Sequence, residues 1–230
     1  MITKTDNDNR CDAVLVVAFG GPQGPEDVRP FLTRVTRGRV PAERLEAVAR
    51  HYDIFGGKSP VNEITQNQAK SLETALCNKG VSWPVYIGMR NWHPLLQDAV
   101  VEMKRDGIRR AVVVIMSVFQ SSSSWDQYQA EVSHAVAQAG ADISVAYTGP
   151  VFDHPAFIKT VSKKVLQCMT PIPEDQRHKT CMLFTAHSLP HDDPGVGLYV
   201  EQINRCARLV GNAMGHDYWQ IAYQLSLIHI

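Results

Sequence analysis

The stretch from Thr180 to Pro190, TCMLFTAHSLP, carries the strongest local signal of fold and function in the chain. Its apolar run, Cys181 to Phe184, predicts a short buried strand, and Pro190 cannot continue a strand ladder. His187 is therefore expected just past the carboxyl end of a strand. Ligands bind at this edge in open α/β sheets, and a histidine there can accept a proton or ligate a metal near neutral pH. A structural histidine satisfied by loop backbone is the alternative that spacing alone leaves open.

Strand and helix patterns alternate along the rest of the chain. Buried or half-buried strands are expected at 13–19, 84–88, 111–116, 142–147, 181–184 and 218–223. Apolar residues spaced by three and four predict helices at 26–35, 42–53, 62–76, 95–105, 125–139, 155–169 and 198–214. The serines at 121–124 are expected to form a loop. Repeated strand–helix alternation favours parallel sheets flanked by helices, an α/β fold.

Composition excludes several classes of function. The 230 residues are 44% apolar and 20% charged with a formal net charge of zero, so nothing favours binding to nucleic acid or to an anionic membrane. No apolar run is long enough to span a membrane, and the polar residues 1–10 do not form a signal peptide. Five scattered cysteines without a C-x-x-C pair are typical of reduced thiols in a cytoplasmic protein.

Five motifs stand along the chain in a fixed order. They are VAFGGP at 17–22, TRGR at 36–39, YDIFGGKSP at 52–60, GMRNWHP at 88–94 and AHSLP at 186–190. Together they resemble the ferrochelatases, lyases that insert ferrous iron into a porphyrin. The R-N-W form of the fourth motif is similar to actinobacterial-type members that act on coproporphyrin III. Ordered motifs over nearly the whole chain are far more specific than any one of them.

The resemblance implies two Rossmann-like, chelatase-type domains with a porphyrin cleft between them. The expected division is a disordered tail at 1–10, an N-terminal domain at 11–118 and a second domain at 119–224. Family members continue well past Gln224, so the second domain is expected to be incomplete. Residues 225–230 match no part of the family and are expected to be a non-native tail. Strand–helix alternation alone would also permit one large sheet.

By resemblance, His187 is the catalytic residue and the metal ligand. A neutral imidazole can take a pyrrole proton and bind Fe²⁺. In the family a glutamate faces this histidine across the cleft, and its position lies beyond residue 230. A chain without that carboxylate would hold Fe²⁺ weakly, and we expect the 230 residues to be marginally stable with an open sheet edge.

The resemblance also indicates residues that bind the porphyrin. Ser59 and Tyr128 match positions that touch its carboxylates or rim, and Phe19 stands where some members carry a metal-approaching tyrosine, so it can only pack against the macrocycle. The remaining porphyrin-binding candidates are Tyr52, His51 and Arg37. Hydroxyl, imidazole and guanidinium groups can all donate to a propionate. A buried ring at Tyr52, a core ring at Phe19 and a solvated charge at Arg37 are the alternatives.

Cofactors and alternatives follow from what the motifs contain. Fe²⁺ is expected as substrate, with no nucleotide, because Gly20 to Gly24 lacks the spacing of a dinucleotide loop. No [2Fe–2S] cluster is expected, since Trp125 stands near where some members place a cluster cysteine. The expected partner is the porphyrin substrate, coproporphyrin III or protoporphyrin IX. The protein is expected to be a monomer and to bind no nucleic acid. A cobalt chelatase and a non-catalytic tetrapyrrole-binding module remain the alternatives.

Overall fold

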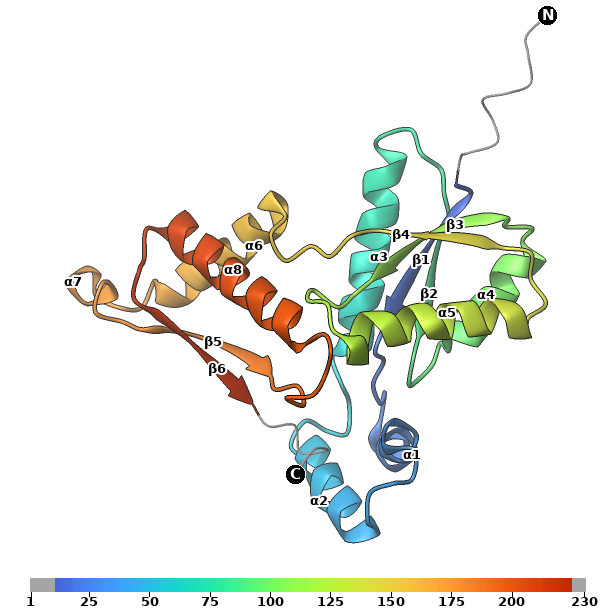
Figure 1. Cartoon of the computed structure of the whole chain (residues 1–230), viewed down its shortest axis with the longest axis horizontal. Coiled ribbons are helices and arrows are strands. Elements are labelled where there is room, and N and C mark those ends of the chain that lie inside the picture. The colour runs from blue at the N-terminus through green and yellow to red at the C-terminus, as the bar shows by residue number, and fades with distance from the viewer. Residues whose placement is uncertain (1–10, 225–230) are drawn as a thin grey trace, which may run out of the picture. The chain divides into compact units, whose positions relative to one another are not determined.

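The computed structural model describes residues 11–224, and the tails predicted at 1–10 and 225–230 lie outside the described residues. The chain divides into two compact units. Of the described residues, unit 1 holds 11–116 and 127–148, and unit 2 holds 117–126 and 149–224. Helices and strands of both units are labelled in Figure 1.

Unit 1 is built on a four-stranded parallel sheet with the order β2-β1-β3-β4. Its strands are β1 (Ala13–Ala18), β2 (Val85–Met89), β3 (Arg110–Ile115) and β4 (Ser144–Tyr147). All six residues of β1 are buried, because the strand has neighbours on both edges and helices on both faces. The continuous apolar run that predicted this strand is therefore the signature of a central parallel strand.

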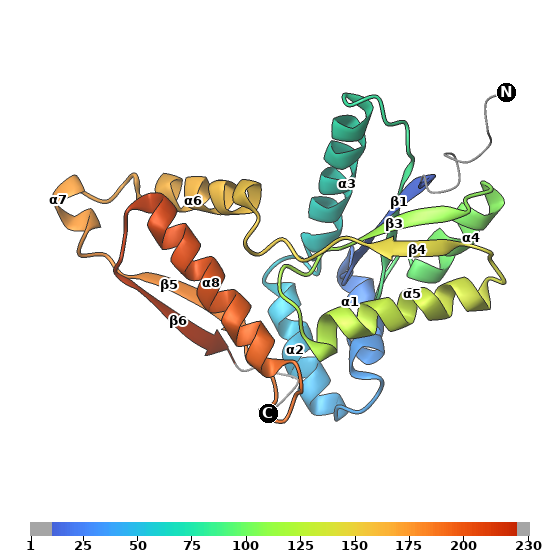
Figure 2. The same ribbon diagram turned by 45° about the horizontal axis from the view of Figure 1, so that its top comes forward.

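Helices cover the two faces of this sheet (Figures 1 and 2). On one face α3 (Val61–Cys77) packs its Ala69 against Val14 and Val16 of β1. On the other face lie α4 (Leu96–Arg105) and α5 (Gln127–Gln138), which pack on each other. The chain moves from β1 to β2 in one direction and from β2 to β3 in the other. Right-handed crossovers place the connecting helices of such a pair on opposite faces.

Two more helices of unit 1 follow β1 and form a helical pair. They are α1 (Pro25–Thr36), which begins at a proline suited to a first helical turn, and α2 (Ala42–Asp53). Their contact is a cluster in which Phe31 of α1 and Ala49 of α2 are both buried. The pair thus stands between the carboxyl end of β1 and the start of α3.

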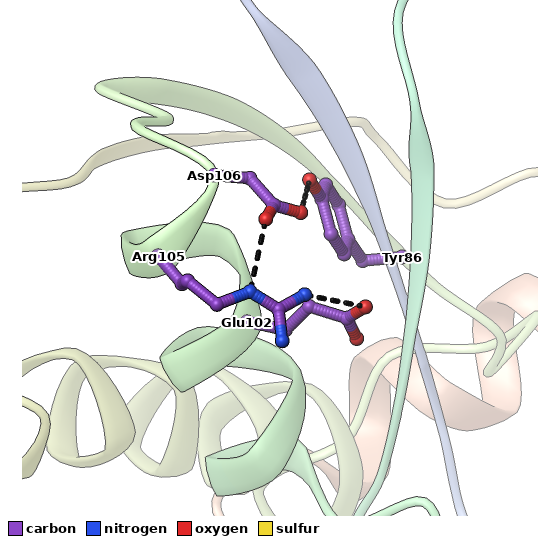
Figure 3. Close-up of polar contacts among 4 residues, drawn as sticks. All are labelled: Tyr86, Glu102, Arg105 and Asp106. Atoms are coloured by element: carbon purple, nitrogen blue, oxygen red, sulfur yellow. Dashed lines mark hydrogen bonds and ion pairs between the residues drawn. The ribbon is translucent and has the colours of Figure 1, made fainter.

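A polar cluster ties the C-terminus of α4 to β2 (Figure 3). Tyr86 Oη donates a hydrogen bond of 2.8 Å to Asp106 Oδ2, and Arg105 Nε donates one of 3.2 Å to Asp106 Oδ1. Arg105 Nη2 also lies 3.4 Å from Glu102 Oε1. Burial first, and then the bond to Asp106, raise the pKa of Tyr86 to about 12. The cluster therefore holds a neutral phenol at this edge of the sheet.

Unit 2 contains a two-stranded parallel sheet of β5 (Met182–His187) and β6 (Trp219–Gln224). One face packs on α6 (Pro155–Met169) and α8 (Val196–Met214), where Phe184 joins a buried cluster with Val210. Burial alternates along β5, and Leu183 on the other face is 60% exposed. Among the described residues, this sheet is thus covered on one face.

Most of the predicted elements are confirmed, and three details differ. The range 42–53 is confirmed as α2 and 155–169 as α6. The short helix α7 (Glu174–Arg177) was not predicted, and the expected serine loop contains a π-helical turn, η1 (Ser122–Asp126). Strand β5 runs through His187 and does not end at Phe184, because its ladder with β6 continues to the pair His187–Gln224.

The division into units differs from the predicted boundary after residue 118. The prediction assigned 127–148 to the second domain. Strand β4 instead pairs with β3, so this segment belongs to unit 1. Within residues 11–224, no helix is both long and apolar enough to cross a membrane.

Candidate functional site

The loop that follows β2 extends the ladder of β1 beyond its last strand residue. Arg90 N donates to Ala18 O at 2.9 Å, and Asn91 N donates to Phe19 O at 3.0 Å. The side-chain amide of Asn91 donates a second bond of 3.1 Å to the same carbonyl. Two of the sequence motifs, VAFGGP and GMRNWHP, are thereby fixed side by side at the carboxyl edge of the sheet, where ligands bind in α/β folds.

A third motif is joined to this edge by a buried asparagine. Asn62 at the start of α3 is 3% exposed and makes two bonds with the peptide of Gly21. Gly21 N donates to Asn62 Oδ1 at 2.9 Å, and Asn62 Nδ2 donates to Gly21 O at 2.7 Å. A Cβ at Gly21 would lie 2.6 Å from the Cβ of Ser59, so this contact requires glycine. Ser59 N completes the junction with a bond of 2.8 Å to Pro22 O.

An aromatic cluster lies next to this junction. The ring of Phe31 has three edge-to-face neighbours, with centroids 6.4 Å from Phe19, 6.2 Å from Tyr52 and 6.1 Å from Trp92. Trp92 Nε1 donates a bond of 2.9 Å to Asp27 Oδ2, which fixes its ring. Phe19 is 43% exposed at the edge of the cluster. Its ring is thus held from one side and offers the rest of its surface to a ligand.

The turn after α2 presents further side chains. Tyr52 O accepts bonds from Phe55 N at 2.9 Å and Gly57 N at 2.8 Å, which close the turn. Ile54 and Phe55 point outward and are 77% and 74% exposed. His51 is exposed, whereas Tyr52 is half-buried and burial raises its pKa. Ile54 and Phe55 are not among the predicted site residues, although two adjacent apolar residues before a Gly-Gly turn are a usable signal of an apolar contact surface.

Tyr128 is too buried to serve mainly as a ligand contact. It is 5% exposed, and burial raises its pKa to about 12. The guanidinium carbon of Arg90 lies 5.5 Å from the centre of its ring. Arg90 Nε donates to Glu131 Oε1 at 2.9 Å, and its Nη2 donates to Gln127 Oε1. Tyr128 therefore supports Arg90, a charged residue at this edge that the sequence analysis did not single out.

His187 belongs to unit 2 and is the last residue of β5. Its carbonyl accepts a bond of 3.1 Å from Tyr199 Oη, and the next residue, Ser188, is bound to Gln224 O through N at 2.8 Å and Oγ at 2.6 Å. The backbone of His187 is therefore fixed from two elements. Its imidazole is exposed and has no hydrogen-bond or ion-pair partner within residues 11–224. An imidazole in this state can accept a proton or ligate a metal.

The loop after His187 is anchored on η1 and the residues before it. Asp193 Oδ2 accepts a bond of 2.5 Å from Ser122 Oγ, and Asp193 Oδ1 accepts one of 2.7 Å from Gly195 N. Gln202 of α8 is 4% exposed and makes two bonds with Gln120, from Gln120 N at 2.8 Å and to Gln120 Oε1 at 2.7 Å. A π-helical turn often accompanies a functional site, and this one holds the loop that follows His187.

The predicted site residues fall into both units. Unit 1 holds Phe19, Arg37, His51, Tyr52, Ser59 and Tyr128, and unit 2 holds His187. Arg37 lines a cavity of about 390 Å³ in unit 1 that none of the other predicted residues lines. Within the described part of the chain, no three histidine, cysteine, aspartate or glutamate side chains converge to hold a metal ion.

Comparison with known proteins assigns this arrangement to a family. The family model described as Ferrochelatase matches residues 11–227. The chain is 40% identical over 218 residues to the coproporphyrin III ferrochelatase of Mycolicibacterium smegmatis, covering 93% of this chain and 64% of that protein. It is 42% identical to the coproporphyrin III ferrochelatase of Mycobacterium tuberculosis strain H37Ra, covering 93% of this chain and 61% of that protein. The chain thus spans less than two thirds of the length of these relatives.

A solved structure has a similar fold. The sirohydrochlorin chelatase SirB from Bacillus subtilis subspecies spizizenii, solved in complex with cobalt, superposes with a TM-score of 0.53 at 13% sequence identity. The match covers 93% of this chain and 67% of that chain. The likeness confirms the expected chelatase-type α/β fold with parallel sheets flanked by helices.

Proposed function

Because this chain belongs to the ferrochelatase family, we propose that it is part of an enzyme that inserts Fe²⁺ into coproporphyrin III during haem biosynthesis. The observation that carries the proposal is the family match over residues 11–227, which includes His187 with its exposed imidazole at the end of β5. The names of the mycobacterial relatives favour coproporphyrin III over protoporphyrin IX.

The reaction needs a base and a ligand for the metal. Fe²⁺ replaces the two N–H protons of the porphyrin, so two protons leave and no electron is transferred. We assign His187 as the catalytic residue that takes a pyrrole proton or ligates the incoming iron. The support is chemical, since a neutral imidazole performs both tasks near pH 7 and suits a borderline metal such as Fe²⁺. Iron is a substrate in this scheme and not a resident cofactor.

The porphyrin contacts belong to the same proposal. The exposed ring of Phe19 and the apolar turn residues Ile54 and Phe55 suit the flat macrocycle. Ser59 and His51 offer donors for its carboxylates. Further contacts are proposed for Tyr52, Arg37 and Tyr128, the last through its support of Arg90.

The state of the cysteines and the sequence motifs are the basis for proposing a localisation and partners. All five cysteines are free thiols, which is typical of a reducing compartment, and we place the enzyme in the cytoplasm. Cys206 is buried, and burial raises its pKa to about 11, so it is an unreactive core residue. We propose a monomer that uses no nucleotide, no nucleic acid and no [2Fe–2S] cluster.

An anaerobic absorbance titration with coproporphyrin III and Fe²⁺ tests this proposal. It compares the 230-residue chain with the same chain joined to the remaining C-terminal part of the M. smegmatis relative. We expect the joined chain to form the metalloporphyrin. His187→Ala should abolish insertion and leave the shift of the porphyrin spectrum on binding, whereas His178→Ala, which removes another exposed histidine of unit 2, should keep full activity.

The outcomes separate the alternatives. Spectral shifts without metallation by either chain would favour a tetrapyrrole-binding module and remove His187 from the mechanism. Insertion of Co²⁺ in preference to Fe²⁺ would favour a cobalt chelatase. A parallel titration with protoporphyrin IX decides between the two porphyrins.

A further inference from the structure

The cavity that Arg37 lines in unit 1 has the size and chemistry of a ligand site. Its volume is about 390 Å³, within the range of small-molecule pockets. It is walled by the end of α1, the loop between β2 and α4, and one side of α5. The ionisable lining residues are Arg34, Arg37, Arg90, Glu131 and His134. Met89 and Leu96 contribute apolar wall, and Gln97 and Gln138 contribute amides.

The charges of this cavity do not cancel. Glu131 is the only carboxylate in its lining, and it is already paired with Arg90 Nε at 2.9 Å. The guanidinium groups of Arg34 and Arg37 have no hydrogen bond or ion pair within residues 11–224. The cavity therefore carries an excess of positive charge from two arginines, beside a histidine that adds a further charge when protonated.

The backbone at the end of α1 adopts an unfavourable conformation that keeps both arginines at the cavity. Arg37 caps α1 with φ of 52°, a left-handed conformation that favours glycine, and its N–H donates to Arg34 O at 3.1 Å. Residues other than glycine rarely adopt this conformation, because their Cβ comes too close to the following carbonyl oxygen. The conformation ends α1 while both side chains still line the same cavity. Local strain of this kind is a recognised feature of ligand sites.

We propose that this cavity binds a small organic anion bearing at least two carboxylate or phosphate charges. Two of its lining residues, Arg37 and Arg90, are shared with the proposed porphyrin contacts, whereas Arg34 and His134 are not among those contacts. Guanidinium groups bind such oxyanions through paired N–H bonds, and two of them on one wall match two acidic groups. The apolar wall at Met89 and Leu96 suits the carbon skeleton between these groups. The proposal goes beyond the proposed function, because its ligand is not the porphyrin and because Arg34 has no role in iron insertion there.

Calorimetric titration of the 230-residue chain at low ionic strength tests the proposal, with citrate and inorganic phosphate as probes and acetate as the monoanion control. We expect saturable binding of citrate or phosphate and none of acetate, and the stronger of the two identifies the carboxylate or phosphate source. Arg34→Gln should weaken binding by ~10-fold or more, since hydrogen bonds to charged groups are worth at least that factor. His134→Ala, which removes a lining side chain contributed by α5, should also weaken the binding.

Arg39→Gln is the matched control. It removes the same charge from an exposed position five residues after Arg34, just beyond the end of α1, but Arg39 does not line the cavity, so affinity should stay within ~2-fold. Equal losses in Arg34→Gln and Arg39→Gln would show diffuse surface charge and overturn the proposal. So would the absence of binding of both probes, or unchanged affinity in both Arg34→Gln and His134→Ala. A loss of coproporphyrin III affinity in Arg34→Gln as large as its loss of citrate affinity would merge the cavity with the porphyrin site and overturn the proposal.

Discussion

Strands β1 and β5 both end at proposed ligand-binding residues, but their surroundings differ. Every residue of β1 is buried between two neighbouring strands and two layers of helices. Strand β5 has one neighbouring strand among the described residues, and its exposed face includes Leu183 at 60% and His187. The difference separates two requirements of a site. Unit 1 supplies an edge at which loops are fixed by hydrogen bonds, whereas unit 2 presents the exposed imidazole of His187 on an uncovered face.

The largest expected difference between these strands is the cost of losing a leucine. Leu15→Ala in β1 removes a side chain that is 1% exposed, and should destabilise unit 1 by about 3–5 kcal/mol through lost burial and a cavity. Leu183→Ala in β5 should cost less than about 0.5 kcal/mol, because its side chain is already in water. Hydrogen exchange of β1 and β5 peptides measures both. Similar losses in the two strands would contradict the comparison.

The second prediction concerns the junction at the edge of unit 1. Asn62→Ala leaves the N–H and C=O of Gly21 without their partners, and should destabilise unit 1 by about 2–4 kcal/mol. Asn67→Ala removes an exposed amide from the same helix and serves as the control, with no measurable change expected. Denaturant unfolding followed by circular dichroism gives the two values. If Asn62→Ala leaves the free energy of unfolding unchanged, the loop is held by other contacts.

The third prediction is a pH dependence that arises from Tyr128 in unit 1. Burial raises the pKa of Tyr128 to about 12, above the ordinary value of ~10. The folded protein therefore keeps the phenol protonated where the unfolded chain ionises it. The stability contributed by this phenol is complete below pH ~10 and is lost as the pH rises towards 12, by roughly 3 kcal/mol in total. Tyr128→Phe should flatten the alkaline part of a plot of unfolding free energy against pH. An unchanged slope would argue against the burial of this phenol.

The smallest expected effect lies in unit 2, beside the histidine. Tyr199→Phe removes the bond from Tyr199 Oη to His187 O and should cost about 1 kcal/mol, seen as faster exchange in the β5 peptide. Tyr218→Phe, at an exposed tyrosine of the same unit, is the control. Because the ring of Tyr199 also packs edge-to-face on Phe119, phenylalanine should preserve the packing. Exchange that rises equally in both variants would show that the bond does not hold β5.

Local sequence was sufficient for elements whose signals are contained in one stretch. Helix α6 begins at Pro155 and keeps its apolar spacing to Met169, and its bounds were predicted to the residue. The central strand β1 was evident from its continuous apolar run. Strand β5 was predicted too short, because the ladder that carries it through His187 depends on bonds to β6, which lies more than thirty residues further along the chain.

The sequence by itself therefore determined the α/β class, most helices and strands, and the family motifs, and it supplied the prediction that His187 is the residue to test. Only the tertiary structure decided that 127–148 returns to unit 1, that Asn62 joins two motifs through Gly21, and that Arg34 and His134 line one cavity. The physical reason is the range of the forces involved. Periodicity and turn chemistry act over a few neighbouring residues, whereas strand partners, buried hydrogen bonds and cavity walls join residues that meet only after the chain has folded.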